Sequence, residues 1–304
     1  MTDHQAHLPQ QEWFVAGASA IGAAHVARGA PCQDAFGLVA PSVAGDPVVV
    51  ALADGHGAAR HFRSEAGAEF AVEAATRVAL RHTERLAAMT QPADVQAAAL
   101  AEVAAEIVQD WFQAVARAVE KDPFSPDELA QMAWGGDSVE IPYGATLLTA
   151  VVAGRWLVCL QIGDGDVVVV HPDGSALLPI PVDPSLDGVR TTSLCQPDAL
   201  ESFREFVQDL EIQPVLAVLM VSDGYSNAQS ADPWYPAVGA DLARLLRHEG
   251  PEWVAERLPE WARRCASSEG SGDDTTMVLM VRRGAAPPVG SVSPSQARTV
   301  TESR

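Results

Sequence analysis

The stretch Val48-Val49-Val50-Ala51-Leu52-Ala53-Asp54-Gly55-His56-Gly57 is a run of six apolar residues followed by a carboxylate, two glycines and a histidine. Such a run predicts a short buried strand, and a buried strand delivers its last side chain to a sheet edge with little positional freedom. Three other apolar runs border aspartates: residues 156–163 precede Asp164, residues 215–222 precede Asp223, and Asp273-Asp274 precedes residues 275–281. Carboxylates that converge repel one another unless cations hold them together, so the pattern predicts a site for hard metal ions.

The segments around these runs predict a layered α+β domain. Residues 64–89 and 93–119 are expected to form long amphipathic helices, because apolar residues recur there at three- and four-residue steps. The runs 145–152, 156–162 and 167–171 are joined by tight turns, which predicts antiparallel neighbours. Further strands are expected over 12–22, 34–39, 47–53, 215–221 and 276–281, and shorter helices near 200–207, over 241–248 and over 253–265, with one more within 122–138.

The length of 304 residues suffices for one large domain with a substantial core. No linker or repeat interrupts residues 12–283, which we therefore expect to form a single domain. Residues 1–11 are expected to be a flexible arm. Residues 284–304, rich in glycine, proline, serine and threonine, are expected to be a disordered tail.

The charge of the chain argues against several classes of partner. A net charge of −20 disfavours direct binding of nucleic acid and of an anionic membrane surface. The only lysine, Lys121, is not part of a GxxxxGK phosphate-binding loop, and its Glu-Lys-Asp-Pro context argues against covalent catalysis by lysine. There is no apolar stretch of about 18 residues, so no membrane span is expected.

The sequence also indicates a compartment. Residues 1–12 lack the basic-then-apolar signature of a secretion signal. The four cysteines are widely and irregularly spaced, which favours reduced thiols over disulfides. We therefore expect a cytoplasmic protein.

Each aspartate motif has a purely structural alternative. Asp-Gly is a strong hairpin signal, and the apolar flanks of Asp164-Gly165 favour a plain turn as much as a site. Asp54-Gly55-His56-Gly57 instead leads into a helix, and its two glycines let the backbone approach a ligand and leave the imidazole exposed. Asp273-Asp274 could be a solvated turn, and Asp34 a loop carboxylate that caps a nearby amide. Several histidines without zinc-site spacing are expected to be surface or core residues, namely His25, His61, His82, His171 and His248.

The type of ligand atom selects the metal. Oxygen-only ligands favour Mg²⁺ or Mn²⁺ over Zn²⁺, and two such ions about 3.5–4 Å apart can bind a phosphate group and generate hydroxide near neutral pH. A chain with a net charge of −20 would repel a phosphomonoester dianion. Clustered cations would reverse that field locally.

Six short motifs stand in a fixed order along the chain: Gln33-Asp34, Asp54-Gly55-His56-Gly57, Gly144-Ala145-Thr146, Gly163-Asp164-Gly165, Ser222-Asp223-Gly224 and Gly272-Asp273-Asp274-Thr275-Thr276. In this order they resemble the PPM family, the metal-dependent serine/threonine protein phosphatases of type 2C. The resemblance covers about residues 15–283, and residues 22–35 are similar to the bacterial branch of the family. It implies a four-layer α-β-β-α sandwich of two antiparallel sheets flanked by helix pairs, with the metals at one end of the sheets.

The resemblance also implies roles for individual residues around two Mn²⁺ or Mg²⁺ ions. Asp54 would bridge the two ions, and the carbonyl of Gly55 would be a further ligand. Asp223 and Asp273 would complete the shell of the second ion. Asp34 would contact the first ion, mostly through water.

Further roles implied by the resemblance concern catalysis and substrate choice. Asp164 would help to hold a third, weaker ion. His56 would protonate the leaving alkoxide, and Arg28 is the best candidate for the phosphate-binding arginine, although it stands one residue further from Asp34 than in the family. A metal-bridging hydroxide would attack phosphorus in line, without a covalent phosphoenzyme. Residues 179–213 take the place of the family's variable flap, which is expected to shape substrate choice.

These inferences predict a Mn²⁺- or Mg²⁺-dependent phosphatase that acts on phosphoserine and phosphothreonine in proteins. Its expected partner is a serine/threonine kinase or the targets of that kinase, and its expected state is monomeric. Two alternatives remain open. A regulatory binding module with the phosphatase fold would have negligible turnover, and a small-molecule phosphomonoesterase would use the same chemistry on another leaving group.

Overall fold

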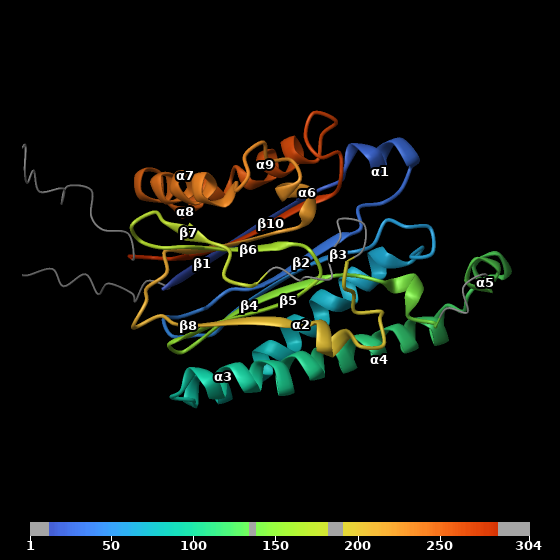
Figure 1. Ribbon diagram of the computed structural model, residues 1–304, viewed down its shortest axis with the longest axis horizontal. Coiled ribbons are helices and arrows are strands. Elements are labelled where there is room, and N and C mark those ends of the chain that lie inside the picture. Colours follow the sequence, from blue (N-terminus) through green and yellow to red (C-terminus); the bar gives the residue numbers. More distant parts are fainter. Residues whose placement is uncertain (1–11, 134–137, 182–190, 285–304) are drawn as a thin grey trace, which may run out of the picture.

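Two antiparallel β-sheets pack face to face between two layers of helices, as Figure 1 shows. The computed structural model describes residues 12–133, 138–181 and 191–284, and within these ranges each sheet has five strands. The first sheet has the strand order β1-β10-β9-β6-β7, and the second has the order β2-β3-β4-β5-β8. The expected four-layer α-β-β-α sandwich is therefore confirmed.

The strands other than β7 and β8 follow the predicted apolar runs closely. They are β1 (Trp13–Ala20), β2 (Asp34–Val39), β3 (Val48–Asp54), β4 (Leu147–Ala153), β5 (Trp156–Ile162), β6 (Asp166–Val170), β7 (Ala176–Leu177), β8 (Arg204–Asp209), β9 (Ala217–Val221) and β10 (Thr275–Arg282). The α-helices are α1 (Ala23–Arg28), α2 (Ser64–Ala88), α3 (Pro92–Ala98), α4 (Ala105–Lys121), α5 (Pro126–Ala133), α6 (Asp223–Ser226), α7 (Tyr235–His248), α8 (Pro251–Ala255) and α9 (Leu258–Cys265). A π-helical segment, η1 (Ala99–Ala104), joins α3 to α4, and two 3-10 turns are η2 (Ile141–Tyr143) and η3 (Ala199–Ser202).

Strand β3 is apolar at every position before Asp54 because both of its faces are covered. Val50 and Leu52 pack in the core between the two sheets. Val49 and Ala51 point the other way and pack in the core beneath α2. A strand that is solvated on one face would alternate apolar and polar residues, so the uninterrupted run reflects burial on both sides. Asp54 is the first polar residue of this strand and lies at its end.

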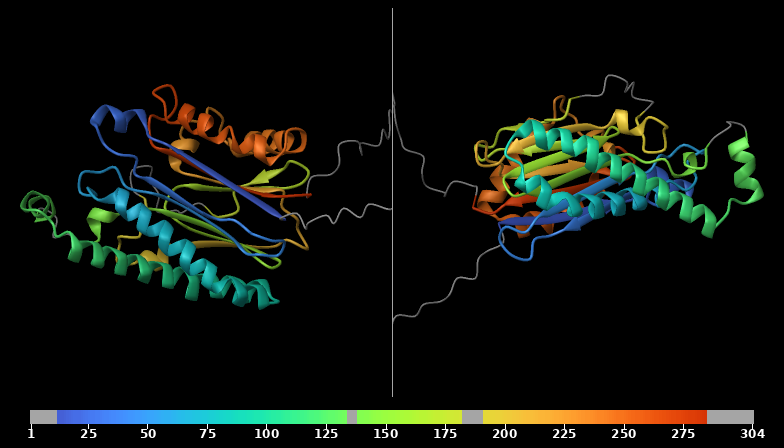
Figure 2. Two further views of the ribbon diagram at one scale, coloured as in Figure 1. Left: turned by 180° about the vertical axis from the view of Figure 1, so that it is seen from behind. Right: turned by 90° about the horizontal axis from the view of Figure 1, so that it is seen from below.

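Helix α2 lies close to the second sheet because its buried face is built of small residues (Figure 2). Residues of this face without exposed surface include Ala68, Ala71, Ala75 and Ala79. Helix α2 also lies against the turn η2 at Gly67, where a Cβ atom would lie 1.8 Å from the carbonyl oxygen of Tyr143. This contact fixes the turn η2 against α2 and thereby positions Gly144, the residue that follows the turn.

Strand β6 corrects one prediction. Strands β4 and β5 are antiparallel neighbours as expected, but β6 pairs with β9 in the other sheet. The chain crosses between the sheets at Gly163-Asp164-Gly165, where Gly163 has a φ of 104° and a Cβ on Gly165 would lie 2.8 Å from the carbonyl oxygen of Val221. The motif is a crossover and not a hairpin, because β8 already occupies the second edge of β5.

Other predictions differ in detail. The helix predicted near 200–207 is wrong, because the turn η3 is followed there by β8, whose pairing partner β5 is distant in the sequence. The helix predicted over 93–119 contains the π-helical segment η1, and the helix predicted over 253–265 divides into α8 and α9. The division falls just before Pro259, which lies in the first turn of α9, where proline is favoured.

The predicted arm over 1–11 and nearly all of the predicted tail over 284–304 lie outside the described residues. The described elements run from β1 to β10. Within the described ranges, no helix combines the length and the apolar character that crossing a bilayer requires.

We expect the substitution Gly67→Ala to destabilise the protein, although alanine is the better helix former by about 1 kcal/mol. The new methyl group would overlap the carbonyl group of Tyr143, and overpacking of this kind costs about 1–3 kcal/mol. Urea unfolding measures the change. Glu69→Ala, at an exposed position of the same helix, is the control and is expected to stay within about 0.5 kcal/mol of wild type. A Gly67→Ala protein as stable as wild type would disprove the close contact between α2 and η2.

Candidate active site

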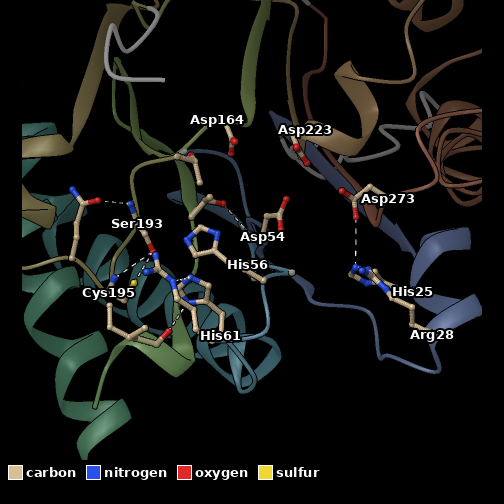
Figure 3. Close-up of a pocket in the computed structure, with 18 residues that line it drawn as sticks. His25, Arg28, Asp54, His56, His61, Asp164, Ser193, Cys195, Asp223 and Asp273 are labelled. Atoms are coloured by element: carbon tan, nitrogen blue, oxygen red, sulfur yellow. Dashed lines mark hydrogen bonds and ion pairs between the residues drawn. The ribbon is translucent and has the colours of Figure 1, made fainter. Parts of the chain in front are cut away.

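A cavity of about 840 Å³ opens at the end of the sandwich that carries α1, and the predicted aspartates gather there (Figure 3). The predicted residues that line it are Arg28, Asp54, Gly55, His56, Asp164, Asp223 and Asp273. Asp34 is the exception, because it lines a separate groove beside β2. The charge of Asp34 nevertheless acts on Asp54, so all of the predicted ligands belong to one neighbourhood.

Strand register places Asp34 beside Asp54. The two residues are partners in the pairing of β2 with β3. Oδ2 of Asp34 accepts a hydrogen bond from Oγ of Ser222 at 2.9 Å. Ser222 follows β9 of the other sheet and leads directly into Asp223. The serine hydroxyl therefore ties the two sheets together next to the cavity.

The carboxyl groups of Asp54 and Asp223 influence each other's pKa, although Asp54 ends β3 of one sheet and Asp223 follows β9 of the other. Burial raises the pKa of Asp54 well above its usual range, and the charges of Asp34 and Asp223 act in the same direction. Burial also raises the pKa of Asp34 to about 7 and, with the charge of Asp164, that of Asp223 to about 6. In the protein without bound metal ions, protons therefore reduce the repulsion among these carboxylates, and divalent cations would reduce it in the same way.

The donor atoms of this cluster are oxygens, which fits Mg²⁺ or Mn²⁺. Oδ1 of Asp34 is buried and has no hydrogen-bond partner among the described residues, and such an atom costs free energy until a proton or a cation satisfies it. Across residues 12–133, 138–181 and 191–284, no three His, Cys, Asp or Glu side chains are already arranged as a metal site. The carboxylates are gathered, and they would have to turn toward an ion to bind it.

Position 55 is a glycine because the backbone passes too close to its neighbours for a side chain. The N–H of Gly55 donates to the carbonyl oxygen of Gln33 at 3.0 Å. A Cβ at this position would lie 2.6 Å from the carbonyl oxygen of Ser64. The N–H of Asp54 donates to Oγ1 of Thr146 at 3.1 Å. These contacts fix the backbone from which the Asp54 carboxylate and the Gly55 carbonyl would act.

His56 lies between the carboxylates and a second histidine, His61 (Figure 3). The two rings meet edge to face with centroids 4.8 Å apart. Gly144 packs against both rings, since a Cβ there would lie 2.6 Å from Nδ1 of His61 and 2.8 Å from Cδ2 of His56. Burial, with a smaller effect from the positive charge of Arg60, lowers the pKa of His56 to about 3. His56 is therefore neutral near pH 7 in the protein alone.

Arg28 and Asp164 belong to different parts of the cavity wall (Figure 3). Arg28 is exposed in the last turn of α1 and makes no hydrogen bond or ion pair within the described ranges. Asp164 stands in the crossover between β5 and β6, and burial raises the pKa of its carboxyl group. The turn and the site were alternatives from sequence, whereas here the crossover itself forms part of the wall.

Asp274 is a buried structural carboxylate and not a solvated turn residue. Its Oδ1 accepts the N–H of Gly22 and its Oδ2 accepts the N–H of Gln33, both at 2.6 Å. Nδ1 of His25 lies 2.8 Å from the same Oδ2. These contacts join residues 22–33 to the loop before β10, and they hold two sides of the carboxylate cluster in place.

Sequence reasoning missed several residues of the cavity wall. His25 and His61, expected to be core or surface residues, are buried and line the cavity. Further residues without a prediction are Arg60, Thr191, Ser193, Cys195 and Gln196. The only feature of the sequence that could have indicated the two histidines is their nearness to the motifs Gln33-Asp34 and Asp54-Gly55-His56-Gly57. No local pattern indicates that Ser193 or Cys195 lines the cavity. These two residues belong to the predicted flap, of which residues 182–190 lie outside the described residues.

A sequence model of the protein phosphatase 2C family matches residues 21–263. No curated protein matches the chain. Among solved structures, the chain is similar to PppA, a key regulatory component of T6SS in Pseudomonas aeruginosa. The two share 17% identity over 89% of this chain and 98% of that chain, with a TM-score of 0.55.

Two other solved structures give the same result. Serine/threonine phosphatase Stp1 from Staphylococcus aureus shares 16% identity over 93% of this chain and 100% of that chain, with a TM-score of 0.56. The catalytic domain of serine threonine protein phosphatase PstP, in complex with 2 manganese ions, shares 19% identity over 88% of this chain and 97% of that chain, with a TM-score of 0.52. At these identities the likeness establishes the fold.

Asp274→Ala is expected to lower the free energy of unfolding by about 3 kcal/mol. Two N–H donors would lose their acceptor, and each such loss costs about 1–3 kcal/mol. Asp274→Asn keeps one acceptor oxygen and is expected to lose about half as much. Urea unfolding compares both with Asp241→Ala, which removes an exposed carboxylate on α7. Equal stability of Asp274→Ala and Asp241→Ala would contradict the structural role of Asp274.

The protein without divalent ions is expected to lose stability as the pH rises from about 4 to about 7. Asp34, Asp54 and Asp223 have raised pKa values in the fold, so the folded protein retains protons that the unfolded chain releases above its ordinary value of 3.8. The contribution of these protons to the stability of the fold is complete below pH 3.8. It is lost as the pH rises through the pKa values in the folded protein, about 6 for Asp223 and about 7 for Asp34.

Unfolding measured with a chelator at several pH values tests this dependence. Asp223→Asn removes one titrating carboxyl group at nearly constant shape and is expected to flatten the slope of stability against pH. An unchanged slope in Asp223→Asn would place the proton uptake elsewhere in the molecule.

Proposed function

The chain belongs to the protein phosphatase 2C family, a class of serine/threonine phosphatases, and on that premise we propose that it hydrolyses phosphoserine and phosphothreonine in proteins with Mn²⁺ or Mg²⁺ as cofactor. One observation carries the proposal. The carboxyl groups of Asp54, at the end of β3 in one sheet, and of Asp223, just after β9 of the other, line one large cavity, and burial together with neighbouring carboxylates raises the pKa of each. An arrangement that costs free energy in the protein alone is expected where a cofactor offsets the cost.

The residues proposed to hold the ions are those with oxygen atoms at the cluster: Asp34, Asp54, Gly55 through its carbonyl, Asp164, Asp223 and Asp273. When bound, two such ions would supply positive charge to the phosphoryl oxygens and a hydroxide nucleophile near neutral pH. A related structure, PstP, is in complex with 2 manganese ions, which supports the choice of metal and the number of ions. Asp164 is proposed as a ligand of a third ion.

His56 is proposed to protonate the leaving oxygen. Its imidazole is neutral in the protein alone, because burial lowers its pKa to about 3. A phosphoryl dianion bound beside the ring would raise that pKa, because an opposite charge favours the protonated form. The tight packing of Gly144 against the ring restricts its orientation. Arg28 is proposed to donate hydrogen bonds to phosphoryl oxygens from the rim of the cavity, since its guanidinium group makes no other bond within the described ranges.

The proposed partner is a phosphorylated protein, either a serine/threonine kinase or its targets. PppA is named a key regulatory component, and we extend a regulatory role of that kind to this chain. A cytoplasmic location and a monomeric state stay predictions from the sequence.

Hydrolysis of a chromogenic aryl phosphate is expected to require Mn²⁺ or Mg²⁺ and to stop when a chelator is added. Asp54→Ala and Asp223→Ala are each expected to lower kcat by about 100-fold or more, because each removes a carboxylate of the cluster. Both variants are expected to keep their fold, since the removed group repels its neighbours in the protein alone. Asp241→Ala on α7 is the matched control that retains activity.

A phosphopeptide panel then separates the classes of enzyme and module. Turnover of phosphoserine and phosphothreonine peptides supports the proposal. Metal-dependent turnover of the aryl phosphate with no turnover of any phosphopeptide would point to a small-molecule phosphomonoesterase. Binding of phosphopeptides without turnover of either substrate would point to a regulatory binding module.

A further inference from the structure

The lining of the cavity continues beyond the carboxylates to the far side of His56. We call this part of the cavity the flanking lobe, and its lining includes Arg60, His61, Ile141, Ser193, Cys195 and Gln196. Figure 3 shows the aspartates on one side of His56, and His61, Ser193 and Cys195 on the other. Neither metal binding by the carboxylates nor the proposed hydrolysis involves the residues of the flanking lobe.

Arg60 is held in the flanking lobe by a buried histidine. Its Nε donates a hydrogen bond to Nε2 of His61 at 3.0 Å. Because Nε2 accepts this bond, the ring proton of a neutral His61 resides on Nδ1, which lies 2.5 Å from the carbonyl oxygen of Ile141. His61 is only 4% exposed, so the arginine stem is anchored to the interior while its end remains at the cavity.

Other polar side chains of the flanking lobe already have partners. Oγ of Ser193 donates to the carbonyl oxygen of Ala145 at 3.2 Å. Gln196 accepts the N–H of Ser193 at 3.1 Å and donates to Oγ of Ser202 at 2.7 Å. The terminal nitrogens of Arg60 make no hydrogen bond within the described ranges. They are the donors that this lobe offers to a ligand.

The ligand that these donors fit is anionic. Within the described part of the chain, Arg28 and Arg60 are the only arginines that line the cavity. The protein as a whole carries a net charge of −20, so an acidic ligand is repelled by most of its surface and attracted only where a cation stands free. A guanidinium whose two outer nitrogens are open matches the geometry of a carboxylate or a phosphoryl group.

We propose that Arg60 binds an anionic group next to the phosphorylated residue of the substrate, either a carboxylate or a second phosphoryl group. This rests on the proposed function, in which the phosphoryl group lies at the aspartates and His56 faces the leaving oxygen. The peptide that carries the leaving oxygen then continues past His56 into the flanking lobe. The ring of His61 touches that of His56 and also holds Arg60, so the neighbouring residue of the peptide meets the guanidinium group. The enzyme therefore prefers phosphoserine and phosphothreonine in acidic or doubly phosphorylated sequences.

The test compares kcat/KM for matched phosphopeptides with Mn²⁺ present. One set has glutamate beside the phosphoserine, on either side in turn, a second set has glutamine there, and a third has a second phosphoserine. Wild type is expected to prefer the glutamate and doubly phosphorylated peptides over the glutamine peptides by about fivefold, the upper range for an exposed ion pair. Arg60→Gln is expected to abolish this ratio, and high salt is expected to reduce it in wild type. The ratio for glutamate and the ratio for phosphoserine identify which anion is favoured.

Two variants separate charge from position. Arg60→Lys keeps the charge but loses the Nε bond to His61, and it is expected to retain an intermediate ratio. Arg244→Gln removes the same charge from an exposed site on α7 and is expected to keep the wild-type ratio. Thermal unfolding of each variant verifies that the fold is intact.

The outcomes distinguish this inference from the proposed function. Turnover of all peptides by wild type without an acidic preference overturns the role of Arg60 and leaves the phosphatase in place. An equal loss of turnover in Arg60→Gln on every peptide and on aryl phosphate also overturns it, because Arg60 would then act on the phosphoryl group itself. Absence of turnover on every phosphopeptide, with aryl phosphate hydrolysed, rejects the protein phosphatase and the inference with it.

Discussion

Strand pairing brings several carboxylates close together, and the rest of the structure has to tolerate their mutual repulsion. Asp34 stands opposite Asp54 because β2 pairs with β3 in that register, and Asp223 reaches them from the other sheet. Hydrogen bonds at the site do not offset this repulsion fully, and one oxygen of Asp34 has no partner among the described residues. The large apolar cores on either side of each sheet stabilise the fold against this unfavourable free energy. A stable frame of this kind can hold a strained cluster ready for cations.

The frame also needs a tie between segments that are far apart in the chain. Asp274 provides it by accepting hydrogen bonds from the backbone at Gly22 and Gln33 and by contacting His25. Its neighbour Asp273 lines the cavity. Two adjacent carboxylates thus have different tasks, since one is buried and fully bonded and the other faces the ligand space. Burial, and not residue type, separates the structural aspartate from the one that lines the cavity.

Sequence predicted the parts of the fold that are fixed locally. Strands β2 and β5 begin and end where they were expected, because covered faces demand apolar residues and the ends are marked by charge or glycine. The sheet to which β6 belongs and the existence of β8 escaped prediction, because both depend on pairing with strands distant in the sequence. The same division holds at the site. The predicted aspartates border apolar runs, which is why the sequence could point to them, whereas His61 is held by Ile141, 80 residues away, and no local pattern could reveal that contact.

The crossover at Gly163-Asp164-Gly165 has an evolutionary consequence. Because the chain changes sheets there, the acidic residues of the cavity come from both halves of the sandwich and from the link between them. Nearly the whole described chain separates Asp34 from Asp273. No short segment of the chain carries all the acidic residues of the cavity. Recombination of gene fragments can therefore exchange the outer helices of such a protein, but it cannot move this group of acidic residues to another fold.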